Sequence, residues 1–222
     1  MLAEGGWLRW CVPREFGGKH ESLDVRSLCL IRENLARYDA LADFSFAMQG
    51  LGSGAISLYG NSEQKQNILE EVSAGRMIAG FALSEPDAGS DVAAMSSKAF
   101  STNEGWKVNG EKSWISNGGI ADYYIFFAKT SDQPGSGGIS AFLLEADNPG
   151  LSIAERQEVM APHPLARLQL KDAELSREAL LGEEGKGFGI AMATLNILPT
   201  HRRGRCSRIC QESTGRNSSL QW

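Results

Sequence analysis

The sequence predicts an α+β fold, in which a helical N-terminal domain is followed by a small β-barrel or β-sandwich domain. Apolar residues recur at helical spacing in the first third of the chain, and from about Ile78 short alternating segments are separated by turns. Near Leu181 the helical pattern resumes. With 222 residues, 42% of them hydrophobic and 22% charged, the chain has an average globular composition.

Three helices are predicted before residue 78. Ser22 is available to cap the first, whose apolar positions are Leu28, Ile31, Leu35, Tyr38 and Leu41. The second covers residues 44–59, which are rich in Ala, Gly and Ser and therefore suit close helix packing. Asn61 is a candidate N-cap for the third helix, with Gln64 three residues later, and Gly75 fits the position after its end.

The middle of the chain reads as short strands. Residues 106–108 alternate, Asn109 and Gly110 are a strong two-residue hairpin signal, and residues 113–116 are expected to return as the second strand. Further strands are expected at residues 123–128, 139–144, 151–154 and 168–170. Strands of this length and spacing predict a small barrel or sandwich. An apolar helix follows, carrying Phe188, Ile190, Met192, Leu195 and Leu198, and it ends at Pro199.

Composition narrows the function classes. The net charge of −5 disfavours general nucleic-acid binding, and the apolar stretches are too short to cross a membrane. The first ten residues lack the apolar region of a signal peptide, so a cytoplasmic protein is expected. The four cysteines (Cys11, Cys29, Cys206 and Cys210) are too scattered for a disulfide framework, and the three histidines (His20, His163 and His201) have no partners at metal-ligand spacing.

Two clusters carry candidate chemistry. Residues 81–91 (FALSEPDAGSD) read as a strand ending in a turn that exposes the hydroxyls of Ser84 and Ser90. Such a turn can aim backbone N–H groups at a ligand, and an ordinary polar turn is the alternative. Residues 114–119 (WISNGG) place a large aromatic side chain beside another hydroxyl and a flexible turn, and a buried core tryptophan is the alternative there.

Together these clusters resemble two motifs of the acyl-CoA dehydrogenase family. The first is similar to Thr/Ser-Glu-Pro-x-Ala-Gly-Ser-Asp and the second to Trp-Ile-Thr/Ser-Asn-Gly. Two further stretches match in order, residues 58–65 and residues 181–188. The resemblance implies an N-terminal helical domain over residues 1–77 and a middle β-domain over 78–173. It also implies a C-terminal four-helix domain, of which residues 174–198 would form only the first helix.

The family binds FAD between its middle and last domains, in a homotetramer, and the resemblance assigns contacts by position. Those implied for the cofactor are Phe81, Leu83, Ser84, Gly89, Trp114, Ile115 and Ser116. Ser84 matches a residue whose hydrogen bond to the flavin helps to stabilise negative charge on the reduced ring. Ser90 would contact the CoA portion of the substrate. Ser84 and Ser116 stand where threonine is more usual, and each keeps the hydroxyl.

The resemblance also implies the reaction. A glutamate removes the α-proton of an acyl-CoA thioester while hydride leaves the β-carbon for flavin N5, giving a trans-2-enoyl-CoA. The electrons then pass to an external acceptor such as an electron-transfer flavoprotein. In the family that glutamate lies in the C-terminal helical domain, so no catalytic residue is assigned here, and Glu85 is expected to belong to the turn scaffold.

Two alternative functions stay open. Relatives of the same fold include flavin monooxygenases and oxidases, and a chain without the base would be an inactive remnant that binds flavin or acyl-CoA.

The tail, residues 199–222, carries five arginines and one glutamate, whereas the first 198 residues have a net charge of −9. One codon choice for residues 206–217, shifted by one base, encodes a family-like helix. We therefore expect this tail to reflect a frameshift.

Overall fold

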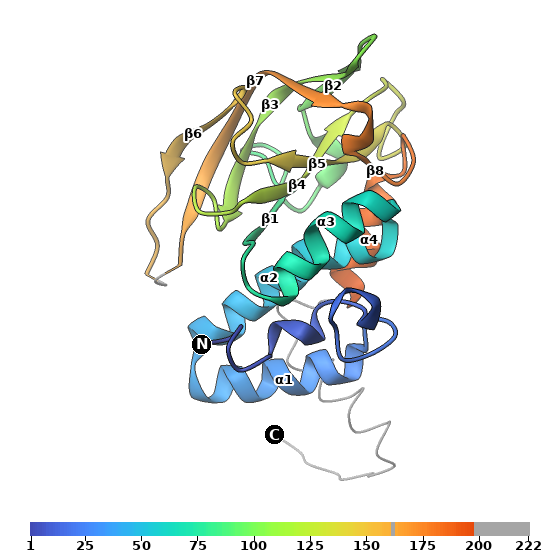
Figure 1. Ribbon diagram of the computed structural model, residues 1–222. Helices are drawn as coiled ribbons and strands as arrows, with labels where there is room; N and C mark the ends of the chain where they lie inside the picture. The colour runs from blue at the N-terminus through green and yellow to red at the C-terminus, as the bar shows by residue number, and fades with distance from the viewer. Residues whose placement is uncertain (161–162, 198–222) are drawn as a thin grey trace, which may run out of the picture.

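The computed structural model describes residues 1–160 and 163–197, so the tail of residues 199–222 and its expected frameshift lie outside the described residues. Figure 1 shows a helical part below a curved sheet, with one further helix beside them. The α+β fold is therefore confirmed, and within the described residues one α-helix follows the middle domain, as expected. The helices are α1 (Val25–Tyr38), α2 (Ala40–Tyr59), α3 (Ser62–Ser73) and α4 (Gly187–Ile197), with 3-10 turns at Leu8–Trp10, Arg14–Phe16, Val92–Ala94 and Arg177–Ala179.

The helix starts are set by local side chains. Asp24, rather than the expected Ser22, caps α1 by accepting a hydrogen bond from the backbone N of Ser27 at 3.1 Å. Asp39 follows the end of α1 and caps α2, accepting from the backbone N of Leu41 at 2.9 Å. Leu41 therefore belongs to the second helix and not, as its spacing indicated, to the first.

The predicted signals at both ends of α3 are confirmed. Asn61 and Gln64 form a reciprocal capping box, in which each side chain accepts a hydrogen bond from the other residue's backbone N, at 2.8 and 3.0 Å. Gly75 follows the helix with φ of +72°, a left-handed conformation that glycine adopts without steric cost. These contacts are local in sequence, which is why the pattern alone identifies them.

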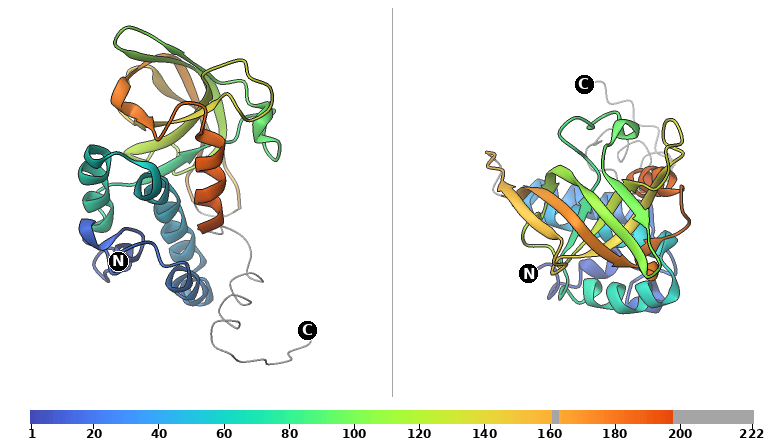
Figure 2. Two further views of the ribbon diagram at one scale, coloured as in Figure 1. Left: turned by 90° about the vertical axis from the view of Figure 1, so that its right-hand side faces the viewer. Right: turned by 90° about the horizontal axis from the view of Figure 1, so that it is seen from above.

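The sheet has the strand order β6-β7-β3-β2-β4-β5-β8, and β1 pairs in parallel with β4. Its strands are β1 (Ala79–Ala82), β2 (Lys98–Ser101), β3 (Gly105–Ser116), β4 (Tyr123–Lys129), β5 (Ile139–Glu145), β6 (Leu151–Arg156), β7 (Leu165–Ser176) and β8 (Leu180–Leu181). Seen from above, the sheet curls so that its strands cross (Figure 2).

Strand β4 is buried on both faces. Tyr123, Ile125 and Phe127 pack in the core that faces the helices, while Tyr124 and Phe126 pack in the core of the curled sheet. A strand covered on both sides reads as a continuous apolar run instead of an alternating one. This explains why residues 123–128 were recognisable as a strand.

The predicted hairpin at Asn109 and Gly110 is wrong, because both residues lie inside the single long strand β3. The side chain of Asn109 instead bonds across to Asp172 on β7, donating from Nδ2 at 3.1 Å and accepting from the Asp172 backbone N at 2.8 Å. The register between β3 and β7 shifts between Val108 and Gly110. Between these two positions β3 advances two residues and β7 advances three, so the turn-like dipeptide lies opposite a bulge in β7.

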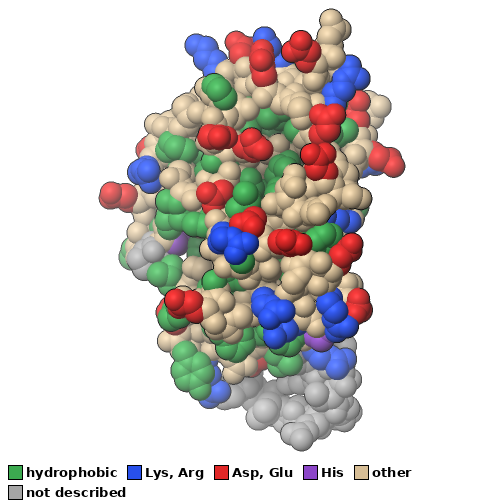
Figure 3. Space-filling model, viewed as in Figure 1, with side chains coloured by type: hydrophobic (Ala, Val, Ile, Leu, Met, Phe, Trp, Pro, Cys, Tyr) green, Lys and Arg blue, Asp and Glu red, His purple; other side chains and the backbone are tan. Residues whose placement is uncertain are grey.

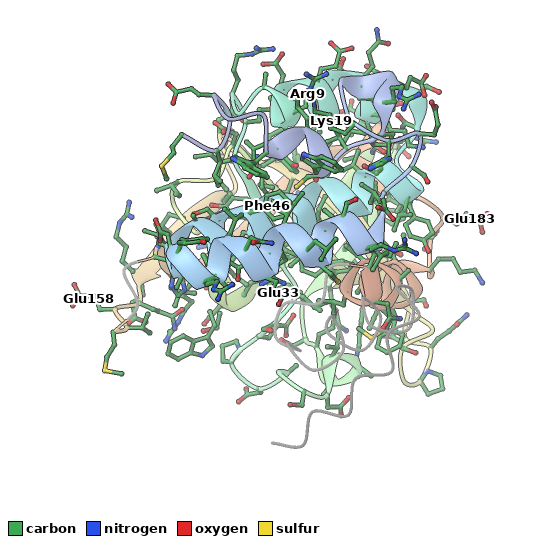
Figure 4. The ribbon with its side chains drawn as sticks, turned by 90° about the horizontal axis from the view of Figure 1, so that it is seen from below. Arg9, Lys19, Glu33, Phe46, Glu158 and Glu183 are labelled. Atoms are coloured by element: carbon green, nitrogen blue, oxygen red, sulfur yellow. The ribbon has the colours of Figure 1, made fainter. Side chains whose placement is uncertain are left out.

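Helix α2 holds the helical part against the sheet. A Cβ on Gly52 would lie 2.4 Å from the Cβ of Ala79, so glycine allows α2 to approach β1 closely. The Gln49 side chain accepts from the backbone N of Ala79 and donates to the Met77 carbonyl, which ties the same helix to the start of β1. Figure 4 shows Phe46 of α2 between the helices, where it is fully buried with residues of α1.

Helix α4 runs beside α2 and against β5 (Figure 2). Its Ile190 and Ala191 join the core between helices and sheet. Leu198, which the sequence placed on this helix, lies outside the described residues. Among residues 1–160 and 163–197, no helix has the length and apolar character needed to span a membrane.

Candidate functional site

The first candidate cluster leaves the end of β1 as a tight turn. Glu85 and Ala88 close it with two backbone hydrogen bonds, Glu85 N to Ala88 O at 3.0 Å and Ala88 N to Glu85 O at 3.2 Å. Before the turn, Phe81 and Ser84 are half-buried and Leu83 is buried. Beyond it, Gly89 and Ser90 are exposed. The hydroxyls of Ser84 and Ser90 therefore lie on either side of the hydrogen-bonded turn.

The second cluster presents its tryptophan to solvent. Trp114 has φ of +60° and is 58% exposed, so the alternative of a buried core tryptophan is wrong. The conformation lies at a register shift between β3 and β7, and the Trp114 backbone N donates to Oε1 of Gln157 at 2.8 Å. Gln157 Nε2 in turn donates to Oγ of Ser113 at 3.2 Å. A left-handed conformation is costly for a residue with a side chain, so these contacts hold the indole outward.

Hydrogen bonds bring the two clusters together. The backbone N of Ser113 donates to the Ser84 carbonyl at 3.0 Å, and Nδ2 of Asn117 donates to the Ala79 carbonyl at 2.8 Å. The end of β3 therefore runs antiparallel beside β1 and the residues that follow it. Of the predicted contacts, Phe81, Leu83 and Ser84 lie beside the segment of Trp114, Ile115 and Ser116, whereas Gly89 and Ser90 lie farther along the turn.

The hydroxyls of Ser84 and Ser116, where the two clusters meet, are available to bind a ligand. Ser84 and Ser116 are half-buried. In the part of the chain that the structure describes, neither side-chain hydroxyl makes a hydrogen bond. Ile115, between Trp114 and Ser116, is buried and anchors the strand in the core of the sheet. The site thus combines an exposed aromatic face with two hydroxyls that make no hydrogen bond within the described residues, one just after β1 and one at the end of β3.

Behind the site lies a buried ion pair that the sequence analysis missed. Lys112 Nζ lies 2.8 Å from Glu85 Oε1, and the exposed fractions of the two side chains are 0% and 2%. Burial opposes ionisation of Glu85, but the Lys112 ammonium and the hydrogen bonds around the carboxylate outweigh it and lower the Glu85 pKa to about 2. Burial lowers the pKa of Lys112 to about 8, although Glu85 favours its charged form. Glu85 is therefore bound as a structural carboxylate, in keeping with its expected scaffold role.

A weak signal for Lys112 was present in the sequence. Along β3, Trp106 and Val108 are buried, and Lys112 shares their even-numbered positions. Alternation with a period of two therefore places the lysine on the inner face, where a charged residue needs a partner. Its partner, Glu85, is 27 residues away, so spacing along the chain gives no indication of the pair.

A groove of about 690 Å³ lies elsewhere, between the start of α3 and the β5–β6 connection, and no predicted contact residue lines it. Its lining includes the acidic residues Glu63, Asp122, Glu145, Asp147, Glu174 and Glu178. Acidic side chains are visible on this face of the middle domain in Figure 3. They would repel the phosphates of FAD or CoA, so we do not place the cofactor there.

The histidines and cysteines form no metal site among residues 1–160 and 163–197. His20 packs on Trp10 with ring centroids 5.1 Å apart, and His163 packs on Phe44 at 4.1 Å, where burial lowers the His163 pKa. Cys11 and Cys29 are buried. The remaining histidine and cysteines, His201, Cys206 and Cys210, lie outside the described residues.

Comparison with known proteins supports the resemblance read from the motifs. Residues 1–76 match the model of the acyl-CoA dehydrogenase N-terminal domain, and residues 80–173 match that of the middle domain. The short-chain specific acyl-CoA dehydrogenase of Megasphaera elsdenii is 38% identical over 187 residues, which cover 82% of this chain and 49% of that enzyme. The chain spans about half the length of the curated relatives it matches.

Solved structures agree with the sequence matches. A chain in the structural study of the electron transferring flavoprotein of Acidaminococcus fermentans superposes with a TM-score of 0.83 at 36% identity, covering 89% of this chain and 52% of that one. PigA in its FAD complex superposes with a TM-score of 0.81 at 28% identity, covering 99% of this chain and 60% of PigA. The chain therefore belongs to the acyl-CoA dehydrogenase family, of which it carries the N-terminal and middle domains.

Proposed function

We propose that this chain binds FAD at the junction of β1 and β3, as part of an FAD-dependent acyl-CoA dehydrogenase. The observation that carries the proposal is the exposed indole of Trp114, held outward by a left-handed backbone beside two unengaged hydroxyls. An exposed aromatic of this size loses favourable burial unless a flat partner covers it. The FAD complex of PigA, a structural neighbour, supports the choice of partner.

The residues present fit a flavin. The indole of Trp114 offers an apolar face for a planar ring, and the Ser84 and Ser116 hydroxyls can donate to its oxygen and nitrogen atoms. The half-buried Phe81 supplies apolar surface near Ser84 and packs on the ring of Phe127 at a centroid distance of 5.1 Å, whereas Leu83 is buried in the core beneath. Hydrogen-bond donors on segments joined by backbone hydrogen bonds, as Ser113 N to Ser84 O joins these two, are preorganised to stabilise negative charge on a reduced cofactor.

When bound, FAD supplies an acceptor for the hydride that leaves the β-carbon of an acyl-CoA thioester. Ser84 and Ser116 orient the ring, Trp114 shields one side of it from water, and exposed Ser90 would hydrogen-bond the CoA portion. We assign no base among the described residues, because the Glu85 carboxylate is bound to Lys112 at 2.8 Å. The family's glutamate in the C-terminal helical domain would remove the α-proton to give the trans-2-enoyl-CoA.

Two partners follow from the same proposal. We expect electrons to pass to an electron-transfer flavoprotein, and a chain similar to this one is present in the structural study of such a flavoprotein. We also expect the full enzyme to assemble as a homotetramer. Sedimentation of the full-length enzyme with and without FAD measures this assembly state directly.

The proposal is tested by titrating the chain with FAD and following flavin fluorescence. We expect saturable binding that weakens roughly tenfold in Trp114→Phe and several-fold in Ser84→Ala and Ser116→Ala, since each removes one contact. The matched control is Trp7→Phe, which alters another exposed tryptophan, 42% exposed, in the N-terminal part. Binding that is absent in the unaltered chain, or equal in all variants, would contradict the proposed site.

A further inference from the structure

The Glu85–Lys112 ion pair lies at the point where the two predicted flavin-contacting segments meet. Glu85 follows Ser84 directly, and Lys112 precedes Trp114 by two residues on β3. Lys112 Nζ contacts both Glu85 Oε1 at 2.8 Å and the carbonyl oxygen of Leu83 at 3.2 Å. One ammonium therefore holds the backbone on one side of Ser84 and the side chain on the other.

The carboxylate of Glu85 is bonded at both oxygens. Oε2 accepts from the backbone N of Ser96 at 2.6 Å and from its Oγ at 2.8 Å, and Oε1 accepts from the backbone N of Ser97 at 3.1 Å. The Lys112 ammonium also lies 4.9 Å from the centroid of the Phe126 ring. The network thus joins the segment that follows β1 to β3, β4 and residues 96–97 around a buried ion pair.

A buried ion pair is an inefficient way to stabilise a fold. Removing two charges from water costs several kcal/mol, and well-packed apolar residues in the same space are often as stabilising or more so. Breaking one half of such a pair is costly, because it leaves a single buried charge. The arrangement does give directional bonds of fixed length, which apolar packing does not.

We propose that Glu85 and Lys112 are positioning residues that set the spacing between the Ser84 turn and the Trp114 bulge, and thereby the geometry of the flavin site. The inference rests on the proposed function. Without the pair, the backbone hydrogen bond from Ser113 N to Ser84 O still joins the segments, but the Leu83 carbonyl and the Glu85 side chain lose their common anchor.

The decisive variant is the double replacement Glu85→Gln with Lys112→Met, which removes both charges and keeps similar side-chain volume. We expect its melting temperature to stay close to that of the unaltered chain. The matched control is the pair Asp43→Asn with Arg32→Met, because the Arg32–Asp43 ion pair in the helical part also has a 2.8 Å contact and exposed fractions of only 13% and 16%. A merely structural role predicts that the two double variants behave alike.

The first readout needs no ligand. All five tryptophans are replaced with 5-fluorotryptophan, and the Trp114 ¹⁹F resonance is assigned by its loss in Trp114→Phe. We expect the Glu85/Lys112 double variant to shift this resonance by more than its linewidth, while the resonances of Trp7 and Trp10 and those of the Asp43/Arg32 control stay in place. An unmoved Trp114 resonance in a folded double variant would overturn the proposal.

The second readout is FAD affinity at a temperature well below the melting transition. We expect the Glu85/Lys112 variant to bind FAD roughly tenfold more weakly than the Asp43/Arg32 control. Unchanged affinity in both would overturn the proposal. If the unaltered chain binds no FAD, the proposed function fails, and the ¹⁹F shift still decides whether the pair positions Trp114.

Discussion

Lys112 and Trp114 lie two residues apart on β3 and occupy opposite environments. The lysine is 0% exposed at its side chain, whereas the tryptophan is 58% exposed. In most proteins the lysine would be exposed and the tryptophan buried. Lysine is almost never fully buried unless it is paired, and a large aromatic side chain is highly buried on average. Each exception is maintained by specific bonds, to Glu85 for Lys112 and to Gln157 for the backbone of Trp114.

The contrast separates two roles on one strand. The inner side of β3 carries a charge network that fixes where neighbouring segments lie, and the outer side presents an aromatic surface that the fold itself does not cover. We therefore expect a change that removes only one partner of the inner-side ion pair to lower stability strongly. Changes on the outer side should alter ligand binding and leave stability nearly unchanged.

The largest effect is expected from Lys112→Met alone. It leaves the Glu85 carboxylate buried without its cation, so the free energy of unfolding should fall by about 3–5 kcal/mol. Urea denaturation followed by circular dichroism measures this loss. The control on the same strand is Lys107→Met, whose pairing with Glu174 at 4.0 Å is exposed and should contribute less than about 1 kcal/mol.

The second effect is a pH dependence. The folded pKa of Glu85, about 2, lies below its ordinary value of 4.5, so the unfolded chain binds more protons between these values. The stabilisation from Glu85 is therefore complete above pH 4.5 and is lost as the pH falls toward 2. At about 1.4 kcal/mol per pKa unit, the loss is at most about 3.5 kcal/mol.

Urea midpoints between pH 2 and pH 6 measure this dependence. The double variant Glu85→Gln with Lys112→Met should show a shallower fall in stability over this window, because the other carboxylates still titrate. A slope equal to that of the unaltered chain would mean that Glu85 is not held ionised by its surroundings.

Sequence patterns predicted some parts of the structure and missed others, depending on how far apart the interacting residues lie along the chain. Local signals were sufficient where both partners are near in sequence, as in the Asn61–Gln64 capping box, and where burial on both faces makes β4 a continuous apolar run. They failed at Asn109 and Gly110, because the decisive partner, Asp172, lies 63 residues away. Family motifs pointed to Ser84 and Trp114, and the structure brought their segments together.

The exposure of Trp114 had no local cause that the sequence could reveal. It depends on a bulge opposite β7 and on Gln157, 43 residues later. Lys112 was missed because a lone lysine on the buried side of an alternating strand is recognisable only once the strand's length is known. The hairpin predicted at residues 109–110 had divided that strand in two.

A smaller effect is expected from Gln157→Ala, which removes the acceptor of the Trp114 backbone N–H and the donor to Ser113. The free energy of unfolding should fall by about 1 kcal/mol, the ordinary contribution of such a hydrogen bond. Hydrogen exchange at the Trp114 amide should accelerate at the same time. Gln133→Ala, in the exposed β4–β5 loop, serves as the control and should change neither quantity.

The smallest change in stability is expected for Trp114→Gly. A tryptophan with φ of +60° carries a backbone cost of roughly 1–2 kcal/mol, which glycine removes. Glycine also adds freedom to the unfolded chain, worth about 0.4–1 kcal/mol in the opposite direction, and the lost ring is mostly exposed. The free energy of unfolding should therefore change by less than about 1 kcal/mol.

The contrast with Trp106→Ala makes this prediction decisive. Trp106 lies near the other end of β3, is 8% exposed and packs on Phe142 at a centroid distance of 5.3 Å, so its truncation should cost about 3–5 kcal/mol. A comparable loss in Trp114→Gly would mean that the exposed indole supports the fold. A stable Trp114→Gly chain that binds FAD at least tenfold more weakly identifies the ring as a ligand surface, because its removal then affects the cofactor and not the fold.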